Sequence, residues 1–120
     1  MNDRAQQRVL KQQFRESPPP AGVFAIRNLA SGRLLLGASL NLEGALNRHR
    51  FELKMRGHRN RDLQADWLAQ GAEGFAFDVV DTVKERPADP AFDREAELEV
   101  LHELWSEEFA RRGAPRYDSR

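Results

Sequence analysis

The spacing of apolar residues predicts three β-strands. Two β-prone runs, at 22–29 and 33–38, flank Ser31-Gly32, where glycine can adopt the positive φ of a tight turn. A third run, 75–82, alternates apolar and polar side chains, as in a strand with one buried face. The residues expected on that buried face are Phe75, Phe77, Val79 and Val83. The pattern therefore indicates a hairpin followed, after an interruption, by one more strand.

Helical spacing of apolar residues predicts four helices. The first, at 3–16, has a narrow apolar edge and ends before three consecutive prolines, which cannot continue a helix. Asn41, Asn60 and Asp93 are expected N-caps for helices near 42–56, 61–70 and 94–112. The in-phase apolar positions expected to be buried against the sheet are Leu42, Leu46, Leu53, Leu63, Trp67, Leu101 and Trp105.

This order of elements predicts an α+β fold with a three-stranded antiparallel sheet covered by helices, and an extra N-terminal helix. At 120 residues the chain is expected to form one domain. The predicted divisions are an N-terminal helix and Pro-rich linker at 1–20, the domain at 21–112, and a loose tail at 113–120. The single tyrosine, Tyr117, falls in that tail and is given no role.

Composition and charge narrow the possible functions. No apolar run is long enough to span a bilayer, and there is neither a signal core nor cysteine, so we expect a cytoplasmic protein without membrane contact. The formal net charge is zero. However, residues 45–61 carry six basic residues against Glu52, a net +5, and residues 73–108 carry twelve acids against three bases, a net −9. The basic segment could present a patch to nucleic acid, or the two halves could attract each other or form solvated faces.

The glycines that bracket the hairpin point to a site. Glycine weakens a strand unless a backbone or a ligand approaches closely, so Gly22 and Gly37 suggest a site or the remains of one. The triplets Gly22-Val23-Phe24 and Leu35-Leu36-Gly37 resemble the paired signature of the GIY-YIG nuclease family. The resemblance covers roughly residues 21–109, through the helices to the late Trp105 helix, and is typical of small stand-alone bacterial members.

The resemblance implies a particular set of catalytic groups. The family has a tyrosine in each triplet, an arginine early in the next helix and a glutamate three residues before the late tryptophan. At the matching positions this chain has Phe24, Leu35, Ala45 and His102. Phe24 and Leu35 cannot transfer a proton, Ala45 carries no charge, and His102 offers nitrogen where Mg²⁺ prefers oxygen. The resemblance therefore implies a catalytically degenerate member.

Several other residues have both a functional and a structural interpretation. His49 is either a phosphate contact or a partly buried histidine between sheet and helix, and His58 is either a phosphate donor or an ordinary loop residue. Glu99 or Glu103 could hold a metal, or both could belong to an acidic solvated face. The candidate nucleic-acid-binding residues are Arg48, Arg50, Lys54, Arg56, His58, Arg59 and Arg61.

Three functional hypotheses follow. The leading one is a degenerate GIY-YIG protein, needing no cofactor, that binds nucleic acid weakly or serves a protein partner. The second is an active Mg²⁺-dependent DNA endonuclease of the same type. The third is an interaction module, for example a homo-oligomer in which the basic and acidic halves of two chains meet.

Overall fold

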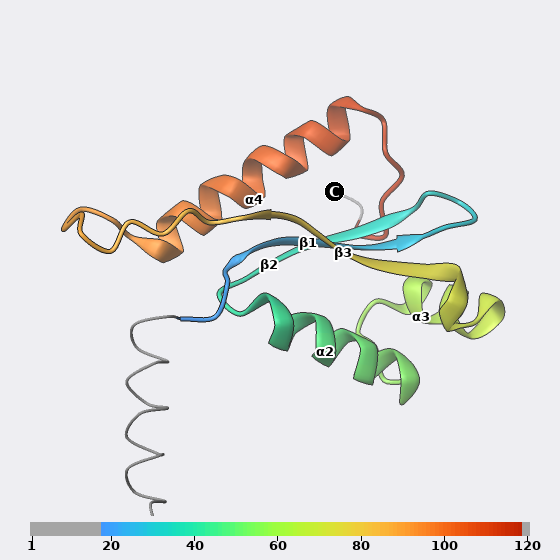
Figure 1. Cartoon of the computed structure of the whole chain (residues 1–120). Coiled ribbons are helices and arrows are strands. Elements are labelled where there is room, and N and C mark those ends of the chain that lie inside the picture. The colour runs from blue at the N-terminus through green and yellow to red at the C-terminus, as the bar shows by residue number, and fades with distance from the viewer. Residues whose placement is uncertain (1–17, 119–120) are drawn as a thin grey trace, which may run out of the picture.

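The computed structural model describes residues 18–118, so the helix predicted at 3–16 lies outside the described residues. Within that range the chain forms three strands, three α-helices and one 3₁₀ turn (Figure 1). In chain order these are β1 Gly22–Asn28, β2 Leu34–Ser39, α2 Leu42–Lys54, α3 Arg61–Gln70, η1 Ala72–Gly74, β3 Phe75–Thr82 and α4 Arg94–Arg111. The α+β class and the three strands expected from the sequence are confirmed, with strand ends within one residue of the prediction.

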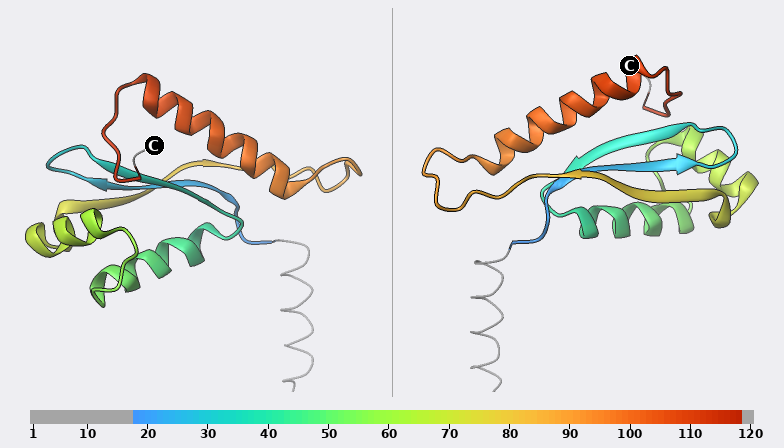
Figure 2. Two further views of the ribbon diagram at one scale, coloured as in Figure 1. Left: turned by 180° about the vertical axis from the view of Figure 1, so that it is seen from behind. Right: turned by 45° about the horizontal axis from the view of Figure 1, so that its top comes forward.

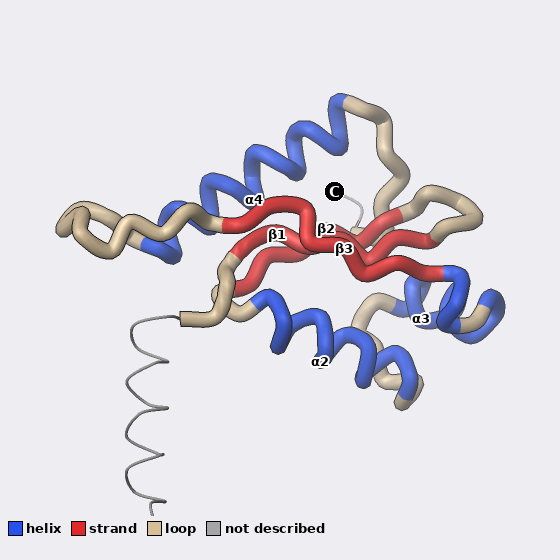
Figure 3. Tube along the Cα trace, viewed as in Figure 1, coloured by secondary structure: helices blue, strands red, loops and turns tan. Residues whose placement is uncertain are grey.

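The sheet has the order β2-β1-β3, and both neighbours run antiparallel to β1. Figure 3 shows the three strands together, between the helices. The central strand is covered on both faces, which explains why Val23 and Ile26, on opposite faces, are both fully buried. The turn of the hairpin is held by Asn28, whose side-chain oxygen accepts hydrogen bonds from the N–H groups of Ala30 and Ser31. Gly32 has φ 78°, as the turn requires.

Helices cover the two faces of the sheet in separate layers. Figure 1 and the two further views in Figure 2 place α2 and α3 on one face and α4 on the other. The core between the sheet and α2–α3 contains Phe24, Ile26, Leu46, Leu53 and Trp67. The core beneath α4 contains Val23, Ala25, Leu34 and Leu36.

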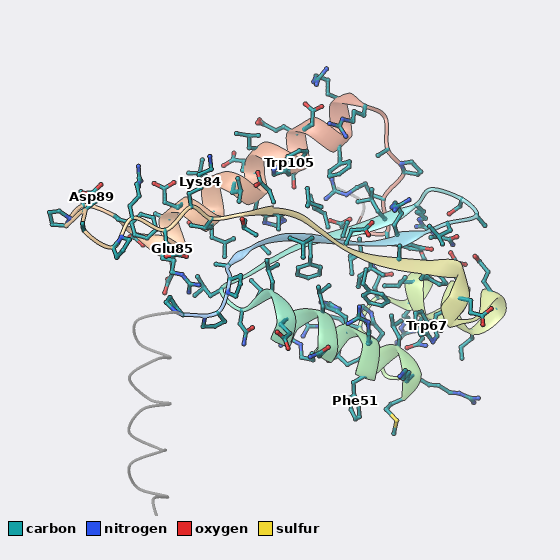
Figure 4. The ribbon with its side chains drawn as sticks, in the orientation of Figure 1. Phe51, Trp67, Lys84, Glu85, Asp89 and Trp105 are labelled. Carbon is teal, nitrogen blue, oxygen red and sulfur yellow. The ribbon has the colours of Figure 1, made fainter. Side chains whose placement is uncertain are left out.

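The two tryptophans, labelled in Figure 4, differ in burial. Trp67 is buried, as predicted. Trp105 and Leu101 are only half-buried, and the Trp105 indole N–H donates to the Asp81 carboxylate at 2.9 Å. The prediction that Leu101 and Trp105 are buried against the sheet is therefore met in part: both pack against the core beneath α4 and remain partly exposed.

The buried face predicted for β3 is wrong at Val79, which is 52% exposed. Pairing with β1 shifts by one residue between Val23 and Phe24, so Val80 is an extra residue in β3. Such a bulge moves the following side chains to the opposite face. Asp81 accordingly faces α4, where it accepts the Trp105 indole N–H. Val80 already faces the core beneath α4 by plain alternation, since Phe75 and Phe77 pack against the core on the other face. Val79 pairs with Phe24 and stays on the α2–α3 side, but it is exposed there.

The predicted helix starts are confirmed by hydrogen bonds. Asn41, Asn60 and Asp93 each accept, through a side-chain oxygen, a backbone N–H three residues further on. The α2 and α4 helices end one or two residues earlier than predicted.

The C-terminal segment is not a loose tail, and this corrects the prediction for residues 114–118. Arg116 forms a parallel bridge with Leu34, and Tyr117 is only 4% exposed. The Tyr117 hydroxyl donates to the Asp66 carboxylate at 2.7 Å and accepts from the Asn28 amide at 2.9 Å. Tyr117 is therefore part of the core on the α2–α3 face, where a buried hydroxyl is satisfied by two partners.

Candidate functional site

A pocket of about 450 Å³ opens between the sheet, α2 and the segment that follows α2. Its wall includes Phe24, Leu35, Ala45, His49, Glu52 and His58. We call it the histidine pocket. It brings together three of the four positions at which the sequence departs from the nuclease signature.

The sheet side of the histidine pocket is apolar. Phe24 and Gly37 are direct partners across β1 and β2, and the Phe24 ring occupies the space above Gly37. A Cβ at Gly37 would lie 2.9 Å from Phe24 Cε1, too close without movement of the ring. Gly22 likewise lies against β3, where a Cβ would be 2.9 Å from the Thr82 Cα atom. The bracketing glycines thus have packing roles.

The helix side of the histidine pocket carries polar side chains, His49 and Glu52. Ala45, His49 and Glu52 follow one another at spacings of four and three, so they share one face of α2. The His49 ring packs against the Phe24 ring, with centroids 5.3 Å apart. His49 is half-buried between sheet and helix, as the structural interpretation of the sequence expected.

His58 is a buried residue and not an ordinary loop side chain, which corrects that interpretation. It is 8% exposed, and its backbone N–H donates to Gln64 Oε1 at 2.9 Å. Gln64 in turn donates to the Leu53 carbonyl at 3.1 Å, so this loop is tied to both helices. The His58 ring also contacts His49, with Nε2 lying 2.8 Å from His49 Nδ1.

The hydrogen bonds fix the proton positions of this histidine pair. The Asn60 backbone N–H donates to His58 Nδ1 at 3.0 Å, so Nδ1 carries no proton. Neutral His58 therefore has its proton on Nε2 and donates it to His49 Nδ1. His49 is then protonated on Nε2. The pair contains no free imidazole nitrogen that could accept a proton from water.

The surroundings also favour the neutral form of both rings. Burial lowers the pKa of His49, and the neighbouring His58 lowers it further. Burial lowers the pKa of His58 as well, although the Glu52 carboxylate opposes this in both cases. The histidine pair is therefore an uncharged donor–acceptor unit beside one carboxylate.

The seven candidate nucleic-acid-binding residues do not all point the same way. Arg48, His58 and Arg59 line the histidine pocket. Arg50 instead lies over the Phe77 ring, 4.5 Å from its centroid. The remaining three, which are exposed and do not line the histidine pocket, are Lys54, Arg56 and Arg61. Two guanidinium groups therefore accompany the histidine pair.

His102 lies outside the histidine pocket. It lines a shallow groove of about 360 Å³ between α4 and the end of β2, with Ala38, Leu40, Glu95, Leu98 and Glu99. We call this the α4 groove. It shares only Ala38 with the histidine pocket. Of the two glutamates considered as metal ligands, Glu99 lines the groove and Glu103 is exposed elsewhere on α4.

These residues do not fit the Mg²⁺ site that the signature implies. Mg²⁺ requires oxygen ligands in near-octahedral geometry, and the matching position holds an imidazole. Within residues 18–118, the one group of His, Asp or Glu side chains close enough to share an ion is His49, Glu52 and His58. Glu99, Glu103 and His102 do not form such a group.

Two features of the site were missed in the sequence. Glu52 was noted only as the lone acid of the basic segment, although its spacing of three residues from His49 placed both on one helical face. The Asn60 side chain donates to the Tyr117 carbonyl at 3.2 Å, so the C-terminal segment supports the loop that carries His58. No local pattern links residues so far apart in the chain.

Comparison with solved structures identifies the fold. Two structures of the catalytic domain of the intron, or homing, endonuclease I-TevI match this chain, one of them a glutamate-to-alanine mutant. The mutant superposes with a TM-score of 0.60 at 17% identity, covering 80% of this chain and 90% of that chain. The other has a TM-score of 0.59 at 18% identity, covering 82% of this chain and 99% of that one. The chain therefore has a GIY-YIG-like fold.

Sequence comparisons add no further relative. No family model matches the chain, and no curated protein is similar enough in sequence to be matched. In the part of the chain that the structure describes, no helix is both long enough and apolar enough to span a bilayer.

Proposed function

We propose that this protein is a catalytically degenerate GIY-YIG protein that binds the phosphate backbone of nucleic acid at the histidine pocket. One observation carries the proposal: Phe24, Leu35 and Ala45, which stand where the signature has two tyrosines and an arginine, line the same pocket as Arg48 and Arg59. The surface retains cations and N–H donors for phosphate. It lacks the hydroxyls and the fixed positive charge of the family.

Without these groups the pocket can still bind phosphate, but it lacks what phosphodiester hydrolysis requires. Phosphodiester hydrolysis requires a general base for water, cations on the developing charge and a carboxylate for the metal. Loss of one such group typically costs about 10²- to 10⁴-fold in rate. By contrast, Arg48 and Arg59 can each still neutralise a phosphate, and a neutral His49 with Nε2–H can donate to a phosphate oxygen.

The expected binding is weak and independent of sequence. With few phosphate contacts and a formal net charge of zero, the dissociation constant should fall in the range of about 10⁻⁴ to 10⁻⁶ M at physiological salt. A protein without net charge adds no long-range electrostatic attraction to this affinity. Fluorescence anisotropy of labelled duplexes of two unrelated sequences, at two salt concentrations, measures all of these properties.

Substitution of the pocket arginines tests the location. Arg48→Ala and Arg59→Ala should each weaken binding about equally for both duplexes and reduce the salt slope by about one. Arg111→Ala is the matched control, because Arg111 is exposed on α4 and pairs only with Glu108 among the described residues. Equal losses in all three variants, or tight binding that survives high salt, would contradict the proposal.

The second candidate is divalent-metal-dependent cleavage by a different set of residues. It is favoured by one observation, the carboxylate of Glu52 beside His49 and His58 in the same pocket. A homo-oligomer or protein partner remains a separate prediction, and sedimentation of the free chain at several concentrations measures it directly.

A further inference from the structure

We propose that His49, Glu52 and His58 bind one transition-metal ion, of the Zn²⁺ type, within the histidine pocket. This inference goes beyond nucleic-acid binding and does not depend on it. It concerns a different place from the α4 position that the nuclease signature reserves for a metal.

The three ligands converge from two consecutive segments. His49 and Glu52 lie three residues apart on one face of α2, and His58 follows after the short loop at the end of that helix. One ligand atom from each lies within 4.8 Å of the other two. In tetrahedral zinc sites, bonds of about 2.0–2.2 Å place ligand atoms about 3.3 Å apart, so small side-chain movements close the site.

The donor types select the metal. Two imidazole nitrogens and one carboxylate oxygen suit Zn²⁺ and similar ions, whereas Mg²⁺ and Ca²⁺ prefer oxygen alone. Three protein ligands also leave a fourth position open, as in catalytic zinc sites. In this pocket that position is available to water or to a phosphate oxygen.

Neighbouring residues hold two of the three ligands in place. The His58 backbone is tied to Gln64, which is itself buried and bonded to the Leu53 carbonyl. The His49 ring rests against Phe24. Among the described residues, the Glu52 carboxylate forms no hydrogen bond or ion pair, so it is free to turn toward an ion. Ligands oriented in this way lose little freedom when a metal binds.

Metal binding replaces two hydrogen bonds, the one between the two imidazoles and the one from the Asn60 N–H to His58 Nδ1, with coordination. In the free protein, the proton between the two rings sits on His58 Nε2. When Nε2 takes the metal, that proton moves to Nδ1, and the Asn60 N–H loses Nδ1 as its acceptor. His49 binds through Nδ1 and keeps its proton on Nε2. No net proton is released, and the Asn60 amide reports the change.

Charges near the site act in both directions. Arg48 and Arg59 repel a divalent cation, and the Glu52 carboxylate attracts it. Burial favours the neutral imidazoles that a metal requires, since the pKa values of both rings are lowered. The site therefore favours an ion whose binding depends more on nitrogen ligands than on electrostatic attraction.

Isothermal titration of the tag-free, chelator-treated chain with ZnCl₂ and with MgCl₂ tests the proposal. We expect one Zn²⁺ per chain, reversed by chelator, and no Mg²⁺ binding. His49→Gln and Glu52→Gln should each weaken Zn²⁺ binding by about tenfold or more. Glu52→Gln keeps the side-chain size on a half-exposed position, and circular dichroism confirms that each variant is folded.

His102→Gln is the matched control, because His102 is the third and last histidine of the chain and lies in the α4 groove. It should leave Zn²⁺ affinity unchanged. Amide NMR provides a second readout, in which Zn²⁺ should shift the Asn60 N–H and convert His58 to its Nδ1–H tautomer. Absence of Zn²⁺ binding, binding unaffected by His49→Gln and Glu52→Gln, or binding lost in His102→Gln would each overturn the proposal.

Discussion

The histidine pocket and the α4 groove open beside the same strand, but they are built differently. The pocket draws His49 from a helix, His58 from a loop and Phe24 from the central strand, and contacts between side chains join all three. The groove draws Glu95, Glu99 and His102 from one helix. Among the described residues, no hydrogen bond links these groove side chains to any other. Polar residues become a site when separate elements hold them against one another.

The largest expected difference between the two regions is in the stability cost of losing a histidine. His58→Ala should lower the free energy of unfolding by about 3 kcal/mol, because it empties a buried position and leaves the Asn60 N–H and His49 Nδ1 without partners. His102→Ala should change it by no more than about 0.5 kcal/mol, since that ring is half-exposed. Urea denaturation of both variants measures the difference. Equal losses of unfolding free energy would contradict the proposed difference between the histidine pocket and the α4 groove.

The next effect concerns Tyr117, whose carbonyl accepts from the Asn60 side chain and so supports the loop that carries His58. Burial, with a contribution from the hydrogen bond to Asp66, raises the pKa of Tyr117 to about 12, against an ordinary value of about 10. The folded state therefore holds the phenol proton more tightly than the unfolded state does. This stabilisation is complete below about pH 10 and is lost as the pH rises toward 12, by about 2 kcal/mol in total.

Tyr117 is the only tyrosine, so its ionisation can be followed directly by tyrosinate absorbance. We expect a midpoint near pH 12 in the folded chain. Tyr117→Phe has no phenol to ionise, so its unfolding free energy should fall less between about pH 10 and pH 12 than that of the unmodified protein. A midpoint near pH 10 in the folded protein would show that the C-terminal segment does not pack as described.

A smaller effect is expected from the sheet wall of the pocket. Gly37→Ala should destabilise the fold by about 1–2 kcal/mol, because the new methyl group displaces the Phe24 ring that His49 rests against. Gly57→Ala is the matched control, since a Cβ there meets no atom within 4 Å and φ is not positive. Its stability should be unchanged or slightly raised. If both variants have the same stability, the close packing of Phe24 on Gly37 is wrong.

Local patterns were sufficient to predict most of the fold. The strand at 75–82 and the caps Asn41, Asn60 and Asp93 depend on neighbouring residues only, and they are confirmed. The buried face predicted for that strand is wrong at Val79. The bulge at Val80 was not predictable, because it depends on how β3 pairs with β1. Tyr117 was missed for a similar reason: its partners are 51 and 89 residues away in the chain.

The candidate site was predictable in part. The triplets and the helix after them were sufficient to select Phe24, Leu35, Ala45 and His49, which the structure brings to one pocket. Fixed spacing could not show that His102 would lie outside that pocket, because that depends on how α4 packs across the sheet. The His49–His58 hydrogen bond was also not predictable from the sequence, because it joins a helix to a loop whose path depends on Gln64.

The central claim is that the pocket retains phosphate contacts and has lost the chemistry of the nuclease fold. A plasmid-nicking assay of the unmodified protein, with Mg²⁺, Mn²⁺ and Zn²⁺ in turn, tests this claim most directly. We expect no metal-dependent turnover with any of the three ions. Nicking with multiple turnovers that is abolished by Glu52→Gln, Glu99→Gln or Glu103→Gln would contradict it, and the variant responsible would identify which region carries the activity.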